Sequence, residues 1–407
     1  MTRGVALALL AAGLAALPAG AQAAWTAQTV TRSGIARSPS VDVDPAGRLA
    51  VAYVRGSGDA ARVELRRGTV RAGIAGAPIL VARDVDRPGT TSVRFDGTSG
   101  STLTAWDHGL AASSSALLSS RSGAPLVPLG PFAGAVAPVA LRAPDGSVRL
   151  VLHGAAGLSV LRPAGERVDL PSAGRDARVA IAASGLIVAA WTQDGRLLVS
   201  VATPGGGFGA PVPLATSGSP RDPLLAAGAD GRVLVAWVAA ANGRTTVEGA
   251  SLAPGAGFGA TMPLAGPDAR APVLVAASNG ELLLAYLDAR DPARAGHVVT
   301  DRGILRLRRL GPDGTPIGDP LRISGPRERT SGAGVAVEPS GVQVVWATPG
   351  SVRARRVAPG GLRGRVRVLS HNGVDGAAVP AVAGGPAGGA AAAWVARGRV
   401  LVARTPE

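Results

Sequence analysis

Short apolar runs recur along the chain, and most of them end in an aromatic residue. Each run ends six residues after a glycine, or five in one case, and is apolar at nearly every position. This pattern is typical of a strand that is buried on both faces. The final residues of the runs are Tyr53, Trp106, Leu152, Trp191, Trp237, Tyr286, Trp346 and Trp394. Their average interval of about 49 residues is close to the length of a four-stranded propeller blade.

Each repeat also contains three flanking strand candidates. An apolar run precedes the glycine, as in 41–43, a second follows the aromatic residue, as in 197–201, and a short proline-containing segment closes the unit, as in 211–214. We name the four strands A to D in chain order. Proline suits strand D if this strand forms the outer edge, where one side has no hydrogen-bonding neighbour. The C–D turns at 204–209 and 254–259 are near copies, and their Phe side chains are predicted to fill space between blades.

The two ends of the chain complement each other. The last unit stops after its strand C at 400–403, whereas 25–30 is a strand candidate with no unit before it. This N-terminal strand is therefore predicted to complete the last blade, which removes an open sheet edge. The sequence predicts an all-β fold, namely a single closed β-propeller of eight blades with four antiparallel strands each. Seven blades would follow if the region 107–175 were divided differently.

The first 23 residues have the pattern of a secretory signal peptide. Arg3 precedes an apolar stretch over 5–17, and Ala21-Gln22-Ala23 fits the small-residue cleavage rule. We therefore expect a secreted, extracellular and monomeric protein whose propeller covers 24–407, with no membrane span after cleavage. The alternative is that this segment stays attached as a membrane anchor. The chain has no cysteine, which excludes disulfides, thiolate metal sites and a cysteine nucleophile.

The chain is strongly basic, with a net charge of +15, and all 42 basic residues are arginine. The exclusive use of arginine is typical of a GC-rich genome. The positive charge therefore has two possible explanations, namely coding bias and a surface that binds anionic polymers. Aromatic residues make up only 3% of the chain. Loops that bind single-stranded nucleic acid need aromatic side chains for base stacking, so nucleic acid is not expected as a partner.

Two kinds of turn resemble those of secreted bacterial propellers of the sialidase-like, Asp-box type. They are the repeated Gly-x-Gly-Phe-Gly turns and the Asp-Gly turns before Trp-ended strands, as in 229–231. The resemblance implies the propeller fold but not the chemistry of the family. No complete Asp-box motif is present, and Ala36-Arg37-Ser38-Pro39 is a poor match to the first catalytic arginine motif. Both tyrosines, Tyr53 and Tyr286, stand at the buried ends of strand B.

Candidate binding residues concentrate in the D–A and B–C loops, which share one face of a propeller. Arginine there stands repeatedly beside an acidic residue. The candidates are Arg87, Asp107, His108, Arg175, Asp176, Arg221, Asp222, Asp268, Arg270, Asp288, Arg290, Arg327 and Arg329. A ring of arginine forks would bind carboxylates, sulfates or phosphates. Alternatively, neighbouring opposite charges neutralise each other and fix the loops.

No sequence motif indicates catalysis, a cofactor or a metal. The nucleophile elbow of serine hydrolases is missing, and the four histidines lack metal-ligand spacing. The segment 42–47 has two alternating carboxylates but no distal Glu, and Asp42 falls within a strand, so it is not a calcium loop. We predict a non-catalytic binding or scaffold protein whose ligand on this face is a glycan or an anionic cell-surface polymer. The alternative is a glycosidase or polysaccharide lyase that uses carboxylates or His108 there.

Overall fold

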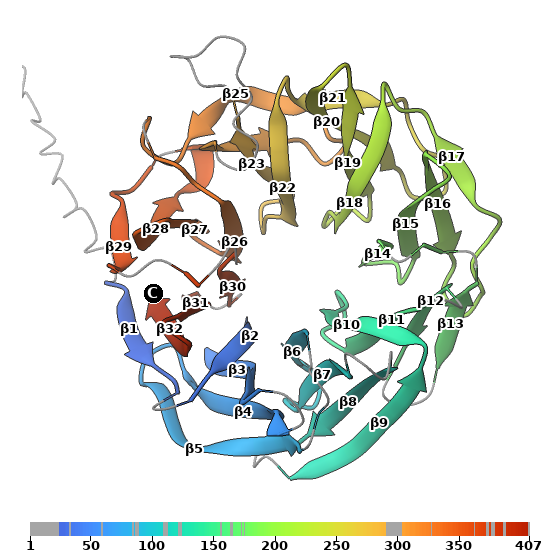
Figure 1. The fold of residues 1–407 in the computed structure, drawn as a ribbon. Helices are drawn as coiled ribbons and strands as arrows, with labels where there is room; N and C mark the ends of the chain where they lie inside the picture. The colour runs from blue at the N-terminus through green and yellow to red at the C-terminus, as the bar shows by residue number, and fades with distance from the viewer. Residues whose placement is uncertain are drawn as a thin grey trace, which may run out of the picture.

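The described part of the chain forms eight four-stranded antiparallel sheets that are arranged radially around one axis (Figure 1). This confirms the predicted eight-bladed propeller. The computed structural model describes residues 24–31, 34–57, 60–83, 85, 89–108, 113–120, 124–154, 157–162, 166–171, 173–174, 176–289, 303–326, 328–361, 363–371, 374–375, 379–385 and 388–405. The predicted signal peptide over 1–23 lies outside these residues.

The first four blades follow each other in chain order, each with its strand A nearest the axis. Blade 1 comprises β2 (Ala36–Val43), β3 (Arg48–Arg55), β4 (Arg62–Thr69) and β5 (Gly73–Ala82). Blade 2 comprises β6 (Thr91–Phe95), β7 (Thr102–His108), β8 (Ser113–Ser119) and β9 (Pro125–Ala133). Blade 3 comprises β10 (Ala135–Arg142), β11 (Val148–Gly154), β12 (Gly157–Leu161) and β13 (Arg167–Leu170). Blade 4 comprises β14 (Arg178–Ile181), β15 (Ile187–Gln193), β16 (Arg196–Ala202) and β17 (Val212–Leu214).

The remaining blades repeat this order, and the last one takes its outer strand from the beginning of the chain. Blade 5 comprises β18 (Ser219–Ala227), β19 (Val233–Ala241), β20 (Arg244–Leu252) and β21 (Met262–Ala265). Blade 6 comprises β22 (Ala269–Ala276), β23 (Leu282–Asp288), β24 (Ile304–Leu310) and β25 (Pro316–Arg322). Blade 7 comprises β26 (Gly332–Glu338), β27 (Gly341–Thr348), β28 (Ser351–Val357) and β29 (Arg367–Ser370). Blade 8 comprises β30 (Ala381–Gly384), β31 (Ala390–Ala396), β32 (Arg399–Thr405) and β1 (Thr26–Thr29).

Strand β1 closes the ring, as the sequence predicts. It pairs antiparallel with β32, from Thr26 opposite Arg404 to Thr29 opposite Leu401. The side-chain amide of Gln28 exchanges two hydrogen bonds with the backbone of Ile74 in blade 1, at 2.8 and 3.0 Å. The N-terminal segment therefore joins the last blade to the first as well as completing the last sheet.

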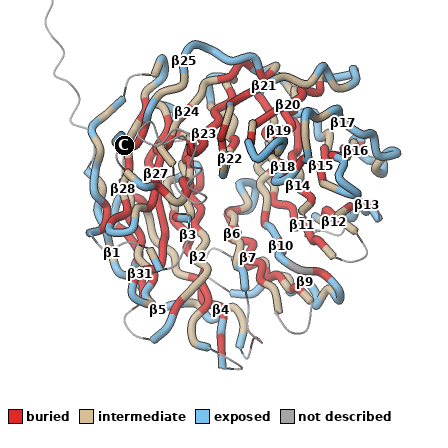
Figure 2. Tube along the Cα trace, turned by 45° about the horizontal axis from the view of Figure 1, so that its top comes forward, coloured by how far each residue is buried: buried red, intermediate tan, exposed pale blue. Residues whose placement is uncertain are grey.

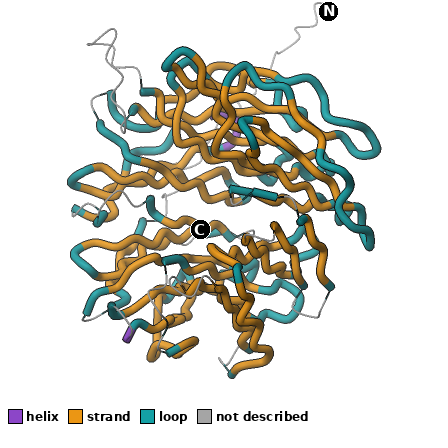
Figure 3. The backbone as a smooth tube through the Cα atoms, turned by 45° about the vertical axis from the view of Figure 1, so that its right-hand side comes forward, coloured by secondary structure: helices purple, strands orange, loops and turns teal. Residues whose placement is uncertain are grey.

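The core lies between neighbouring blades, where the B strands are buried on both faces (Figure 2). Strand β19 is buried from Val233 to Ala239, and Trp237 has no exposed surface. Phe208 and Phe258 of the near-identical turns pack against the cores on either side of blade 4, which confirms their predicted place. Figure 3 shows strands and loops almost throughout, and its helical segments are short 3-10 turns such as Pro359–Gly361. Within the described ranges, no helix has the length and hydrophobicity needed to cross a bilayer.

Several strand-B aromatic residues hydrogen bond to a buried or half-buried acid, which the sequence reading missed. The pairs are Tyr53 with Glu64 at 2.7 Å, Trp237 with Glu248 at 3.0 Å, and Trp346 with Glu328 at 3.0 Å. Burial, followed by the Glu64 contact, raises the pKa of the Tyr53 hydroxyl well above its usual range. A buried polar atom that lacks a hydrogen-bond partner destabilises the folded state. In these pairs both polar groups have a partner, so the aromatic rings are held in place at a small cost in stability.

Candidate ligand-binding face

The D–A and B–C loops lie on one face because strand A begins where strands B and D end in each antiparallel sheet. Nine of the thirteen predicted binding residues are described, and they come from blades 2 and 4–7. The other four, Arg87, Arg175, Arg290 and Arg327, lie outside the described residues. The structure therefore distributes the nine around the face instead of gathering them in one pocket.

Two of the predicted aspartates bind the loops to the blades. Asp107, at the end of β7, accepts hydrogen bonds from the backbone nitrogens of Gly89 and Thr90, at 2.5 and 3.2 Å. Asp176, just before β14, accepts bonds from the backbone nitrogen of Thr192 at 3.1 Å and from its hydroxyl. Each carboxylate thus connects a D–A loop to the end of the neighbouring strand B, and its hydrogen-bonding capacity is largely used by the fold.

Two further aspartates pair with arginines of strand C. Asp268 lies 3.1 Å from the guanidinium of Arg244, and Asp288 lies 2.7 Å from that of Arg306. These partners differ from the neighbouring arginines that the sequence suggested, because strand pairing brings residues 18 to 24 positions apart into contact. Of the neighbouring pairs that the sequence suggested, Arg221–Asp222 forms an exposed contact with its charges 3.9 Å apart.

A recurrent β-bulge distorts the inner strands on this face. The pairing register shifts at Arg37/Ser40, Val136/Val139, Arg221/Leu224 and Arg270/Val273. In each bulge the residue before a proline has a positive φ although it is not glycine. These residues are Ser38 at 49°, Ala137 at 47°, Asp222 at 52° and Ala271 at 44°. Such conformations cost on the order of 1–3 kcal/mol each and are concentrated at functional sites, where bulges redirect side chains.

Three of these bulges present an arginine at the same structural position. Arg37, Arg221 and Arg270 each face, in register, the residue that follows the aromatic end of strand B. We call these three the bulge arginines. Strand β2, which carries Arg37, lies across the ring axis from β18 and β22 (Figure 1). The sequence reading selected Arg221 and Arg270 but missed Arg37, although the repeated Arg-x-Pro pattern could have revealed it.

The remaining candidates have less specific surroundings. His108 is half-buried, and its Nε2 atom lies 3.0 Å from the hydroxyl of Ser115. Arg329 is exposed just before β26. In the part of the chain that the structure covers, no three His, Asp or Glu side chains gather as a metal site would require. Among the described residues, the hydroxyl of Ser115 is the hydrogen-bond partner of His108.

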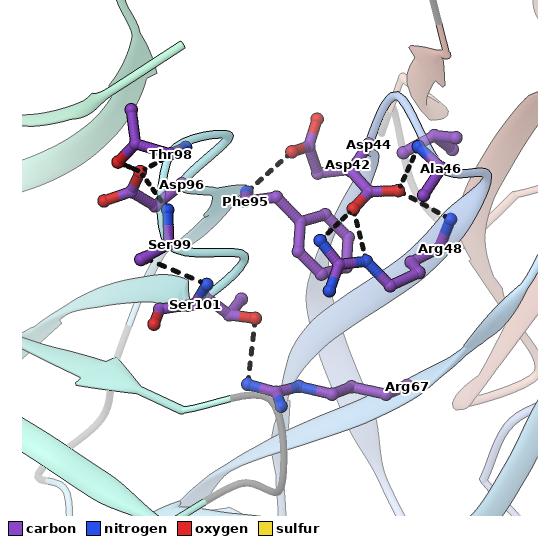
Figure 4. Close-up of polar contacts among 12 residues, drawn as sticks. Asp42, Asp44, Ala46, Arg48, Arg67, Phe95, Asp96, Thr98, Ser99 and Ser101 are labelled. Atoms are coloured by element: carbon purple, nitrogen blue, oxygen red, sulfur yellow. Dashed lines mark hydrogen bonds and ion pairs between the residues drawn. The ribbon is translucent and has the colours of Figure 1, made fainter. Parts of the chain in front are cut away.

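The opposite face holds a polar network between blades 1, 2 and 3, and Figure 4 shows its contacts in blades 1 and 2. Asp44 accepts bonds from the backbone nitrogens of Ala46 and Arg48 and pairs with the Arg48 side chain. Asp42 accepts a bond from the backbone nitrogen of Phe95 at 2.8 Å and pairs with Arg142. Burial raises the pKa of Asp42, and the charges of Arg94 and Arg142 oppose that shift. Asp44 therefore stabilises the turn after β2, and Asp42 connects blades 1, 2 and 3.

An apolar groove of about 600 Å³ lies between blades 4 and 5 on the side of the C–D turns. Its wall includes Val199, Leu214, Leu252 and Phe258, and no charged side chain is among the described residues that line it. The groove therefore offers shape and apolar surface but no fixed charge.

The sequence matches no protein-family model and no curated protein. A structure of prolyl oligopeptidase B from Galerina marginata is similar with a TM-score of 0.53 and 12% identity, over 83% of this chain and 50% of that one. Virginiamycin B lyase from Staphylococcus aureus gives 0.49 and 9%, over 94% and 100%. NanB sialidase from Streptococcus pneumoniae gives 0.41 and 10%, over 79% and 66%. At such identities the likeness is one of fold, and the chain is an eight-bladed propeller.

Proposed function

We propose that this protein is a non-catalytic binding module that holds an acidic glycan or a similar anionic polymer on its D–A/B–C face. The observation that carries the proposal is the repeated bulge, which places an arginine at one equivalent position in blades 1, 5 and 6. Arginine is suited to this task because its planar guanidinium forms paired hydrogen bonds with carboxylate, sulfate and phosphate groups. The proposal includes secretion, as the predicted signal peptide implies.

The carboxylates on the same face favour binding over hydrolysis. A glycosidase needs two carboxyl groups that exchange protons or attack the sugar. Asp107 and Asp176 instead accept hydrogen bonds from loop backbone, and Asp268 and Asp288 pair with arginines. A lyase, a peptidase and a sialidase are among the proteins of similar structure, but their activities are not carried over at 9–12% identity.

The proposal is tested by the thermal midpoint of the protein with a short oligogalacturonate and with a neutral oligosaccharide of equal length. A ligand at one hundred times its Kd stabilises a protein by about 2.7 kcal/mol, so the acidic ligand should raise the midpoint and the neutral one should not. A variant with Arg37→Gln, Arg221→Gln and Arg270→Gln is expected to lose this shift.

The matched control replaces three exposed arginines at the C–D ends of blades 1 and 3, away from the D–A/B–C face, by Gln; these are Arg71, Arg162 and Arg167, so the same net charge is removed. It is expected to keep the shift. If both variants lost the midpoint shift equally, the shift would reflect non-specific electrostatic attraction to the basic protein. If the unmodified protein showed no shift, binding of this ligand class would be refuted. Cleavage of the oligogalacturonate would replace the binding function by the enzymatic alternative.

A further inference from the structure

A second concentration of arginine lies on the outer edge of blades 6 and 7. Residues 303–369 contain twelve arginines and four acidic residues, so about a sixth of the chain carries eight of the fifteen net positive charges. Five of these arginines come from the end of β25, from β28, and from the segment that leads into β29. They are Arg322, Arg355, Arg363, Arg365 and Arg367, which we call the rim cluster.

Two members of the rim cluster donate to one stretch of backbone, which includes the carbonyl of a third member, Arg322. Arg355 donates to the carbonyl oxygen of Ile323 at 2.8 Å, and Arg363 donates to that of Arg322 at 2.9 Å. Arg355 also donates from Nε to the carbonyl of Gly364 at 2.9 Å. Because these contacts use neutral carbonyl oxygens, they orient the guanidinium groups without cancelling their charge.

No acid of the described chain forms an ion pair with a member of the rim cluster. The acid whose charge acts on Arg355, Glu328, pairs with Arg353. The pKa of Arg355 is lowered, first by burial and then by the positive charges of Arg363 and Arg322, while Glu328 opposes the shift. The cluster therefore holds like charges close together, which an anion would relieve.

Exposure alternates along the segment that leads into β29. Arg363, Arg365 and Arg367 are exposed, whereas Gly364 and Val366 between them are half-buried. This alternation is that of an extended chain, in which every second side chain points to the same side about 7 Å apart. A linear partner with charges at a comparable spacing would contact several of them at once.

We propose that the rim cluster is a binding site for a linear polysaccharide that carries sulfate or phosphate groups. The inference does not rest on the proposed function, because its residues lie in β25, in β28 and from 363 into β29, and none of them belongs to a D–A or B–C loop. Sulfate and phosphate match the guanidinium fork in shape and charge. Single-stranded nucleic acid is disfavoured because the only aromatic residue within 303–369 is Trp346, which has no exposed surface on which a base could stack.

Binding of dextran sulfate by the full chain, measured by titration calorimetry at several salt concentrations, tests the site. Uncharged dextran should not bind. A variant with Arg363→Gln, Arg365→Gln and Arg367→Gln is expected to bind at least about tenfold more weakly at low salt. Its affinity should also depend less on salt, because fewer ionic contacts release fewer counterions on binding. The three side chains are exposed, so the thermal midpoint of the variant should stay within about 2 °C of the original.

The variant with Gln at Arg71, Arg162 and Arg167 is the charge-matched control and should bind dextran sulfate within about twofold of the original protein. Equal weakening in the two variants would overturn the assignment to the rim. A single-stranded oligonucleotide that displaced dextran sulfate at lower concentration would overturn the class of ligand. The bulge-arginine variant should retain dextran sulfate binding, so failure here and failure of the loop-face proposal are distinguishable.

Discussion

Removal of residues 24–31 is expected to lower the free energy of unfolding by about 5 kcal/mol and to cause aggregation. The estimate sums the burial of one valine, worth about 2 kcal/mol, and several hydrogen bonds of about 1 kcal/mol each. The valine is Val30, which is 2% exposed. The bonds include those of Gln28 with Ile74 and of the Thr31 hydroxyl with the backbone nitrogen of Val400. Loss of β1 also exposes the edge of β32, which invites pairing with other chains.

Chemical denaturation and light scattering check this expectation, with two proline variants as a matched pair. The backbone nitrogen of Val30 bonds to the carbonyl of Val400 at 2.8 Å, and hydrogen-bonded pairs alternate along an antiparallel ladder. The nitrogen of Thr26 therefore faces β32, whereas that of Ala27 faces outward. Thr26→Pro should destabilise the protein more than Ala27→Pro. Equal stability of the shortened and full chains would show that the ring does not depend on β1.

Trp237→Ala is expected to destabilise the protein by about 3–5 kcal/mol, which is the range for deleting a large buried aromatic side chain. Trp237 is fully buried between blades 4 and 5. Its indole nitrogen also bonds to Glu248, which is 6% exposed. The substitution therefore leaves a cavity and removes one partner of a buried carboxylate, and both effects lower the unfolding free energy.

Trp237→Phe and Trp106→Phe separate the two contributions. Both keep most of the ring, but the Trp106 indole nitrogen has no hydrogen-bond acceptor in the described chain. Only the Trp237 variant leaves a carboxylate with a lost partner, so it should be less stable than the Trp106 variant by about 1–3 kcal/mol. Denaturant midpoints measure the difference. Equal losses of stability in the two variants would mean that the hydrogen bond between Trp237 and Glu248 contributes nothing measurable.

The architecture was predictable because its signals are local and repeated. The glycine that precedes each strand B, the apolar run and its aromatic end all fall within seven residues, as in 231–237. The unpaired strand candidate at 25–30 predicted closure because the last unit lacked a strand D. Blade 3 shows how far the pattern tolerates substitution, since Leu152 replaces the aromatic residue and is 5% exposed.

The contacts of the candidate site were less predictable because they depend on residues distant in sequence. Asp107 binds Gly89 across 18 positions, and Asp42 binds Arg142 across 100. No local pattern distinguishes an aspartate that binds a loop backbone from one that faces a ligand. The positive φ of Ser38 was also hidden, because the strand propensity of its surroundings gives no sign of a bulge.

The closed ring is tested most directly by a disulfide between Ala27→Cys and Ala403→Cys, which would be the only cysteines of the chain. These residues face each other across β1 and β32 in a non-hydrogen-bonded pair, where Cα atoms are about 4.5 Å apart and within disulfide range. Mild oxidation should form the intrachain bond almost completely, whereas the pair Ala27→Cys and Arg399→Cys, displaced by about 13 Å along the strand, should remain reduced. Free thiols in the first pair, or cross-links only between molecules, would contradict closure by the N-terminal strand.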